Sequence, residues 1–160
     1  MKRLLAALAA VALVAALGTG VLVWRLTRDE APQLPEISAF SGGHLTRVGP
    51  YQYCQVLDPT DCLAAGEQGE LPVTGRHPVQ LSISAPIAKA PWVLLRAYED
   101  GDLVEEFRPD TRLAVTIPTV DAQRGRLTGI AVQLPTLVRD QAGNEFPVPH
   151  AEWSVRTVWS

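Results

Sequence analysis

The feature that most constrains this chain is a run of 21 residues without any charge, from Leu4 to Trp24. As an α-helix, this run is about 31 Å long at roughly 1.5 Å per residue, which matches the hydrocarbon core of a bilayer. Basic residues flank the run, and Trp24 stands where an interfacial aromatic anchor is common. We therefore predict an N-terminal transmembrane helix within residues 1–24, acting as an uncleaved signal anchor.

A cleaved secretory signal peptide is the alternative interpretation of the same run. Ala16, Leu17 and Gly18 resemble the small-residue site that precedes cleavage. The apolar residues continue to Trp24, however, which makes the run long for a signal peptide. No cysteine lies near the run, which excludes a bacterial lipoprotein anchor. We expect a single-pass protein of the plasma membrane with its C-terminal domain outside the cytoplasm, or, in the alternative, a secreted domain.

The cysteine count agrees with export. Cys54 and Cys62 are the only cysteines, and Asp58-Pro59-Thr60-Asp61 between them is a strong turn signal. Two cysteines eight positions apart do not form a redox C-x-x-C motif. A structural disulfide between Cys54 and Cys62 is expected, and two independent buried thiols are the alternative.

Composition divides the rest of the chain. Residues 25–36 are polar with two prolines and predict a short tether, so we expect the extracytoplasmic domain over residues 37–160. The whole chain has 14 Lys and Arg against 17 Asp and Glu, a net charge of −3. This balance excludes nucleic acid as a partner bound through its phosphates. It also excludes a polybasic lipid-surface module.

The domain shows the period-two alternation of β-strands and no convincing long helix. In residues 78–84, Val79, Leu81 and Ile83 share one face. Similar alternation marks three further segments, at residues 112–118, 126–134 and 152–160, whereas residues 91–99 are apolar on both faces, as in a central strand of a sandwich. In these segments the predicted inward sets are Leu113, Val115 and Ile117; Thr128, Ile130, Val132 and Leu134; and Trp153, Val155 and Trp159.

Turn signals separate these strands. Asp100-Gly101 predicts a tight hairpin, and residues 121–125 are expected to connect the strands at 112–118 and 126–134. Residues 140–144 are expected to turn between a strand at 136–139 and a short strand that follows. About seven or eight strands with frequent turns favour an antiparallel β-sandwich, and an immunoglobulin-like form is one candidate. The predicted fold class is therefore mostly β, preceded by one transmembrane helix.

The chain shows no pattern typical of a catalytic or metal site. His44, His77 and His150 lack metal-ligand spacing, so surface or turn positions are expected for them. The acidic group Asp100, Asp102, Glu105 and Glu106 is too short for a Ca²⁺ loop and is expected to be a solvated hairpin. No nucleophile elbow or phosphate-binding glycine loop is present. We predict no catalytic residue, no cofactor and no metal.

Aromatic residues are expected mainly in the core and at its edges, and an aromatic-lined groove is the alternative. They are Trp92, Trp153, Trp159, Tyr51, Tyr53 and Tyr98.

Five short motifs together carry a family resemblance. They lie at residues 69–72 (GELP), 90–92 (APW), 116–121 (TIPTVD), 124–129 (RGRLTG) and 150–156 (HAEWSVR). With them, the chain resembles a family of small exported or membrane-anchored actinobacterial proteins, mainly mycobacterial, catalogued as a domain of unknown function. The composition of 12 Arg and 2 Lys is compatible with such a source. The resemblance implies an envelope location and transfers no activity.

Three functions are compatible with these expectations, and we give them in decreasing order of preference. The first is a non-catalytic, membrane-anchored envelope protein, held in the plasma membrane by its N-terminal helix, whose β domain binds an integral membrane protein, another protein partner or an envelope component. The second is a binding module for a lipid or glycolipid of the envelope. A cryptic hydrolase comes last. An apolar cavity of a few hundred Å³ would favour the second function, and an exposed apolar patch the first.

Overall fold

The chain divides into two compact units, residues 1–33 and residues 34–160. The computed structural model describes residues 2–28, 34–58 and 60–160, with the side chains of residues 12–25 in the first helix. The predicted tether at residues 25–36 therefore includes residues 29–33, which lie outside the described part.

The first unit contains helix α1 (Lys2–Arg28), which includes the uncharged run. Within it, the hydroxyl of Thr19 donates a hydrogen bond to the carbonyl of Ala15 at 2.8 Å. Among the described residues, no helix combines the length and the apolar character needed for a membrane span. That residues 1–24 cross a membrane stays a prediction.

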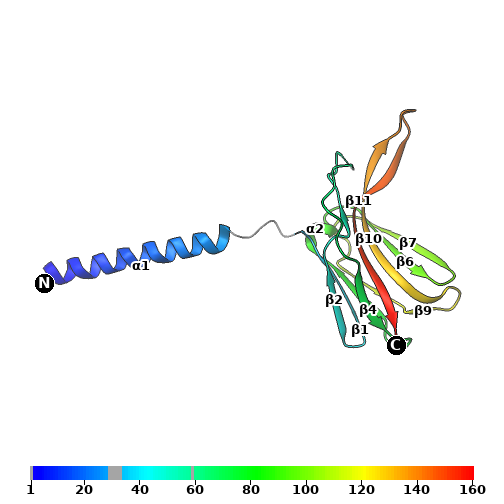
Figure 1. Cartoon of the computed structure of the whole chain (residues 1–160), viewed down its shortest axis with the longest axis horizontal. Coiled ribbons are helices and arrows are strands. Elements are labelled where there is room, and N and C mark those ends of the chain that lie inside the picture. Colours follow the sequence, from blue (N-terminus) through cyan, green and yellow to red (C-terminus); the bar gives the residue numbers. More distant parts are fainter. Residues whose placement is uncertain (1, 29–33, 59) are drawn as a thin grey trace. The chain divides into compact units, whose positions relative to one another are not determined.

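The second unit is mostly β, as predicted, with two sheets in its described residues (Figure 1). The four-stranded sheet has the order β2-β1-β5-β8. Its strands are β1 (Ile37–Ser41), β2 (His44–Val48), β5 (Val79–Ile83) and β8 (Ala114–Ile117). The single helix of this unit in the described residues is the short α2 (Ala85–Ala88), which links β5 to the other sheet.

The seven-stranded sheet has the order β3-β11-β10-β6-β7, with β4 also paired to β11 and β9 to β10. Its strands are β3 (Gln52–Tyr53), β4 (Gly69–Val73), β6 (Trp92–Tyr98), β7 (Gly101–Phe107), β9 (Val120–Asp121), β10 (Gly125–Arg139) and β11 (Glu145–Trp159). The Asp100-Gly101 turn joins β6 and β7 as an antiparallel hairpin, as the sequence predicts.

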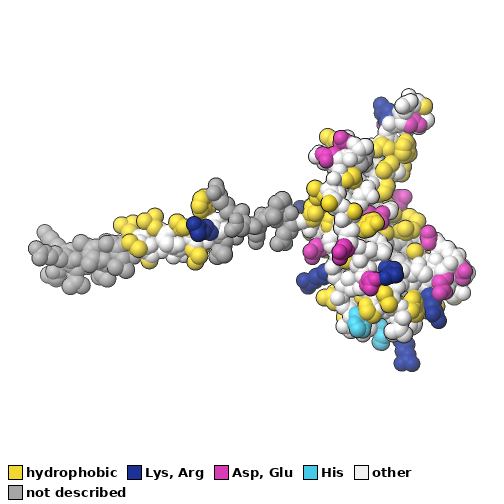
Figure 2. Space-filling view, viewed as in Figure 1, with side chains coloured by type: hydrophobic (Ala, Val, Ile, Leu, Met, Phe, Trp, Pro, Cys, Tyr) yellow, Lys and Arg dark blue, Asp and Glu magenta, His cyan; other side chains and the backbone are white. Residues whose placement is uncertain are grey.

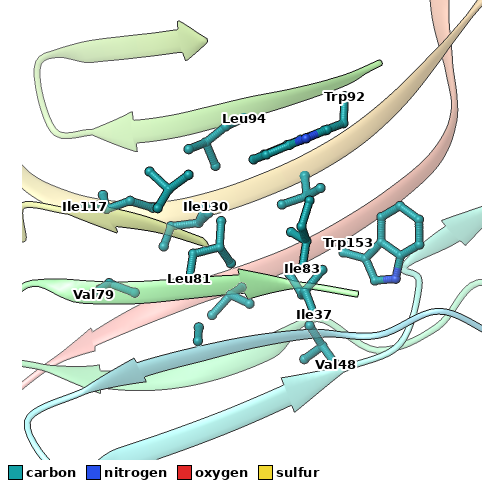
Figure 3. Close-up of a cluster of buried hydrophobic side chains, with 14 of the residues drawn as sticks. Ile37, Val48, Val79, Leu81, Ile83, Trp92, Leu94, Ile117, Ile130 and Trp153 are labelled. Atoms are coloured by element: carbon teal, nitrogen blue, oxygen red, sulfur yellow. The ribbon is translucent and has the colours of Figure 1, made fainter. Parts of the chain in front are cut away.

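One hydrophobic cluster is shared by the two sheets. Val79, Leu81 and Ile83 of the four-stranded sheet are buried, as their alternation predicts, together with Leu94 and Trp153 of the other sheet. Figure 3 shows these side chains in one cluster between the strands. Trp153 has no solvent exposure, so the C-terminal segment is an integral strand.

Two predicted inward faces differ in detail. Leu127, and not Thr128, is buried beside Ile130, because a register shift between Leu127 and Gly129 opposite β6 offsets the alternation. Leu113 is 55% exposed because it precedes β8, whose buried residues are Val115 and Ile117.

The connections after β8 also differ from the sequence prediction. Residues 121–125 close a short hairpin of β9 and β10, whereas β8 pairs with β5 in the other sheet. Pro118 ends β8 and the chain crosses between the sheets there, since proline cannot extend the backbone ladder. Residues 136–139 are the end of the 15-residue β10 and not a separate strand. The β10–β11 hairpin projects from the sheet (Figure 1, orange).

A disulfide joins Cys54 to Cys62, which confirms the predicted pair. It closes a loop that reverses the chain, and we call residues 54–62 the disulfide loop. Beyond it, Leu63 N–H donates to Tyr53 O at 2.9 Å and Gly66 N–H to Tyr51 O at 3.0 Å. The returning segment therefore runs antiparallel to β3, and β4 continues in that direction. As a result β4 lies parallel to β11, the one departure among the described strand pairs from the predicted antiparallel arrangement.

Candidate ligand-binding groove

A groove of about 640 Å³ lies where the β10–β11 hairpin leaves the seven-stranded sheet. Its lining comes from four segments: the start of β6, the end of β7, and both arms of the hairpin. Five prolines give this groove rigid apolar walls, and we call it the proline groove. They are Pro91, Pro109, Pro135, Pro147 and Pro149.

Two stacked rings contribute to the base of the groove. Trp92 at the start of β6 stands directly opposite Phe107 at the end of β7. Their rings are 4.0 Å apart between centroids and inclined by 14°. Trp92 is 1% exposed, and its indole N–H is buried with no hydrogen-bond partner among the described residues. The pair therefore forms a buried apolar support beneath the groove, as part of the hydrophobic core.

The hairpin owes its departure from the sheet to a bulge. Leu134 pairs with Ala151, but the next residue, Pro135, pairs with Pro149, so His150 has no opposite residue. Proline offers no N–H to the ladder, and two facing prolines interrupt the hydrogen bonding at this point. A bulge bends the strand and re-aims the side chains beyond it. Leu137, 67% exposed, lines the groove from the bent arm.

The rim of the groove carries two opposite charges from one strand end. Glu106 and Arg108 both line the groove, and neither belongs to the ion pairs found in the described residues. Gln133 lies on β10, on the other side of β6 from Glu106, and its side-chain amide donates a hydrogen bond to the Glu152 carboxylate at 2.8 Å. Polar contacts are therefore available at the rim of an otherwise apolar groove.

His150 lies at the bulge. It is 9% exposed, and its Nδ1 is buried without a hydrogen-bond partner among the described residues. Its carbonyl accepts a hydrogen bond from Cys54 N–H at 2.7 Å, which ties the bulge to the disulfide loop. Burial lowers the pKa of the His150 imidazole, because charging it would cost solvation.

The other residues that the sequence offers as candidates for a functional site are distributed over the domain. His44 and His77 line a separate hollow with Arg76, and no metal-binding group of three or more ligands occurs in the described residues. In the acidic group, Glu105 pairs with Arg96 at 2.7 Å, whereas Glu106 reaches the groove rim. Glu106 is exposed, as expected for a solvated hairpin, and only the fold places it in the lining of the groove.

The aromatic residues mostly occupy the core and its edges. Trp153, Trp92 and Tyr98 are buried, and Trp159 is partly buried against the core. Trp92 also lines the groove, which sequence reasoning considered only as a general alternative. The signal that could have located the groove is Pro135, Pro147 and Pro149 inside strand-like segments, because proline within a strand marks an edge or a bulge.

Comparison with known proteins places the chain in a family. The family model described as "Protein of unknown function (DUF2771)" matches residues 30–158. An uncharacterized protein of Mycobacterium bovis is 57% identical over 162 residues, covering 99% of this chain and 100% of that protein. Uncharacterized proteins of Mycobacterium tuberculosis strains CDC 1551 and H37Rv match with the same identity and coverage. No solved structure gives a significant match. The resemblance inferred from the sequence motifs is thereby confirmed, and the chain belongs to the DUF2771 family of proteins of unknown function.

Proposed function

We propose that this protein is a non-catalytic, membrane-anchored protein of the cell envelope whose β domain binds an apolar envelope component in the proline groove. The N-terminal helix would hold the chain in the plasma membrane with the domain outside the cytoplasm. The uncharged run at residues 4–24 supports the anchor. The Cys54–Cys62 disulfide supports export, because structural disulfides persist in oxidising compartments.

We also propose that the two sheets form a β-sandwich. The shared hydrophobic cluster supports this arrangement, since a sandwich core is built from the inner faces of two sheets. An immunoglobulin-like form stays a prediction, and the parallel pairing of β4 with β11 departs from the antiparallel sheets of that fold.

The single observation that carries the binding function is the groove itself. Its volume of about 640 Å³ falls within the range of sites for small ligands, about 300–1,000 Å³. Five prolines and a stacked Trp–Phe pair make it apolar and rigid, so little conformational entropy is lost when it is filled. An acyl chain would bury its methylenes against these walls, and Glu106 and Arg108 would face a polar headgroup. An envelope lipid is therefore the ligand class we favour.

A protein partner is the second candidate, favoured by a different surface. Phe40 and Leu45 face each other across the β1–β2 hairpin and are 40% and 56% exposed. An exposed apolar pair of this kind can anchor a protein contact. It lies on the four-stranded sheet, whereas the groove is built from the other sheet, so the two candidates are separable by mutation.

Membrane extraction tests the anchor. The full-length protein is expected to remain in membranes after carbonate washing and to retain its N-terminus, as shown by N-terminal sequencing. A soluble product that begins near Thr19 would replace the anchor with a cleaved signal peptide and leave a secreted domain.

Photocrosslinking tests the groove. Full-length protein would be reconstituted in phosphatidylcholine nanodiscs containing a phospholipid with a diazirine in one acyl chain. Adducts are expected on peptides covering residues 91–93 and 133–137. Leu137→Glu should remove most of these adducts, because it places a charge in the groove at an exposed position. The matched variant Leu45→Glu should leave them unchanged. Adducts confined to residues 2–28 would contradict the lipid-binding function.

A further inference from the structure

The strand pairings place several segments at one end of the β domain. Ile37, the first residue of β1, pairs with Val48, the last residue of β2, and Tyr51 N–H donates to Glu152 O at 2.7 Å. The chain therefore arrives in the domain at the end that carries the disulfide loop and the β10–β11 hairpin. We call this end the proximal end.

Exposed apolar side chains gather on the two projecting loops at the proximal end. Leu57 is the extreme case, with 97% of its surface exposed. A hydrogen bond from the Thr136 hydroxyl to Val56 O, at 3.3 Å, joins the disulfide loop to the hairpin. We call five side chains the apolar tips: Val56 and Leu57 on the disulfide loop, Leu63 directly after it, and Leu137 and Phe146 on the hairpin. Figure 2 shows hydrophobic side chains on the projecting hairpin and on the loop beside it.

The charged groups of the same loops are engaged locally. The Asp58 carboxylate accepts hydrogen bonds from the Thr60 N–H and hydroxyl, at 3.0 and 2.6 Å. Three further contacts act in the same way: Gln55 with Asp61, Asn144 with Asp140, and Arg139 with Glu145. These partners hold the carboxylates within their own loops and leave the apolar side chains directed to the surroundings. These loops carry four carboxylates against Arg139 alone, so the surface is net acidic and not basic, and attraction to anionic lipid is not its driving force.

The length of the connecting segment limits where the proximal end can be. Leu34 lies ten positions after Trp24, a stretch of chain that at most spans about 35 Å at roughly 3.3–3.6 Å per residue. If Trp24 lies at the membrane interface, as the proposed anchor requires, Leu34 remains within that distance of the bilayer. Because the anchor would confine the domain near the membrane surface, apolar contacts that are too weak to bind a free domain to the bilayer can still form.

We propose that the apolar tips insert into the interfacial region of the bilayer that holds the N-terminal helix. This inference rests on the proposed membrane anchor. Side chains such as Leu and Phe are favourable in the headgroup and acyl boundary, where their burial contributes in proportion to area. The proline groove is built from the start of β6, the end of β7 and the hairpin, which also lie at the proximal end. Tip insertion would bring its mouth to the lipid surface.

Depth-dependent fluorescence quenching tests the insertion. A genetically encoded environment-sensitive fluorophore would replace Leu63, or Leu45 at the opposite end of the domain, in full-length protein reconstituted in phosphatidylcholine vesicles. At position 63 we expect the fluorophore to show a blue-shifted emission. It should also lose most of its signal when doxyl-labelled lipid is included. Position 45 should show neither. Equal, water-like emission at both positions would overturn the inference.

Variants and lipid composition sharpen this test. Val56→Asp/Leu57→Asp should abolish quenching at position 63, while Leu45→Asp should leave it intact. Replacing a third of the phosphatidylcholine with phosphatidylglycerol should not increase quenching, and a marked increase would point to electrostatic docking and overturn the inference. Failure to float with vesicles would refute the anchor itself. Groove adducts without quenching at position 63 would support the proposed function and overturn tip insertion.

Discussion

The indole N–H of Trp153 donates a hydrogen bond to the carbonyl of Pro35 at 2.7 Å, across 118 positions of sequence. This contact ties the first residues of the β domain to strand β11. The Trp153 ring also packs edge-on against the Tyr53 ring, with 6.4 Å between the two ring centroids. Trp153 therefore fixes where the chain from the N-terminal helix joins the domain.

Trp153→Phe should lower the free energy of unfolding by about 1–3 kcal/mol, because it removes a partly buried hydrogen bond to Pro35 O and leaves a gap in the core. The measurement is urea unfolding of the full-length protein in mild detergent, followed by circular dichroism. Val158→Ala, at a 40% exposed position of the same strand, should cost less than about 0.5 kcal/mol. Equal losses for the two variants would contradict the role given to Trp153.

Gly69 permits the close approach of β4 to β2. A Cβ at this position would lie 2.2 Å from Val48 Cγ1 and 3.1 Å from Thr46 Cγ2. Gly69→Ala should therefore destabilise the domain by about 1–3 kcal/mol through overpacking. Gly49→Ala is the matched control, since no heavy atom comes within 4 Å of its added Cβ. Combining Gly69→Ala with Val48→Ala should recover part of the loss, and strictly additive losses would count against the clash.

The sequence predicts the strands whose inward side chains are large. In β5, Val79, Leu81 and Ile83 alternate with Gln80 and Ser82, and in the structure the first set is buried and the second exposed, as predicted. In β1 the inward positions include Ala39 and Ser41, which are small or polar, so alternation does not reveal the strand. Ser41 is buried because its hydroxyl donates to His77 O, a contact that only the fold provides.

The groove illustrates a second limit. Trp92, Phe107, Pro135 and Pro149 are distant in sequence, and their proximity depends on the strand order β7-β6-β10-β11 and on the bulge at Pro135. Local patterns predict the face on which a side chain lies but not which strands become neighbours. The disulfide was predictable because its two cysteines and their turn are contained in nine residues, 54–62.

Loss of the disulfide should lower the stability of the domain by about 2–3 kcal/mol, as expected for closing a short loop in the unfolded chain. The double variant Cys54→Ser/Cys62→Ser should unfold at lower urea concentration than the oxidised wild-type protein. Adding reductant should bring the wild-type protein to the same midpoint and leave the variant unchanged. A wild-type midpoint that does not respond to complete reduction would show that the bond contributes nothing.

His150 should make the stability of the domain sensitive to mild acid. Burial lowers the pKa of its imidazole in the folded protein, so the unfolded chain takes up a proton at higher pH than the folded chain does. The stability attributable to neutral His150 is thus complete above the unfolded pKa of about 6.5 and declines as the pH falls from there through the lower folded pKa.

The measurement is the urea midpoint of the wild-type protein and of His150→Gln at pH 7.5, 6.5, 5.5 and 5.0. Because the other titrating groups are common to both proteins, the difference between the two curves isolates His150. The wild-type protein should lose stability relative to the variant as the pH falls below about 6.5. A pH-independent difference between the wild-type protein and His150→Gln would show that the imidazole is not held neutral by burial.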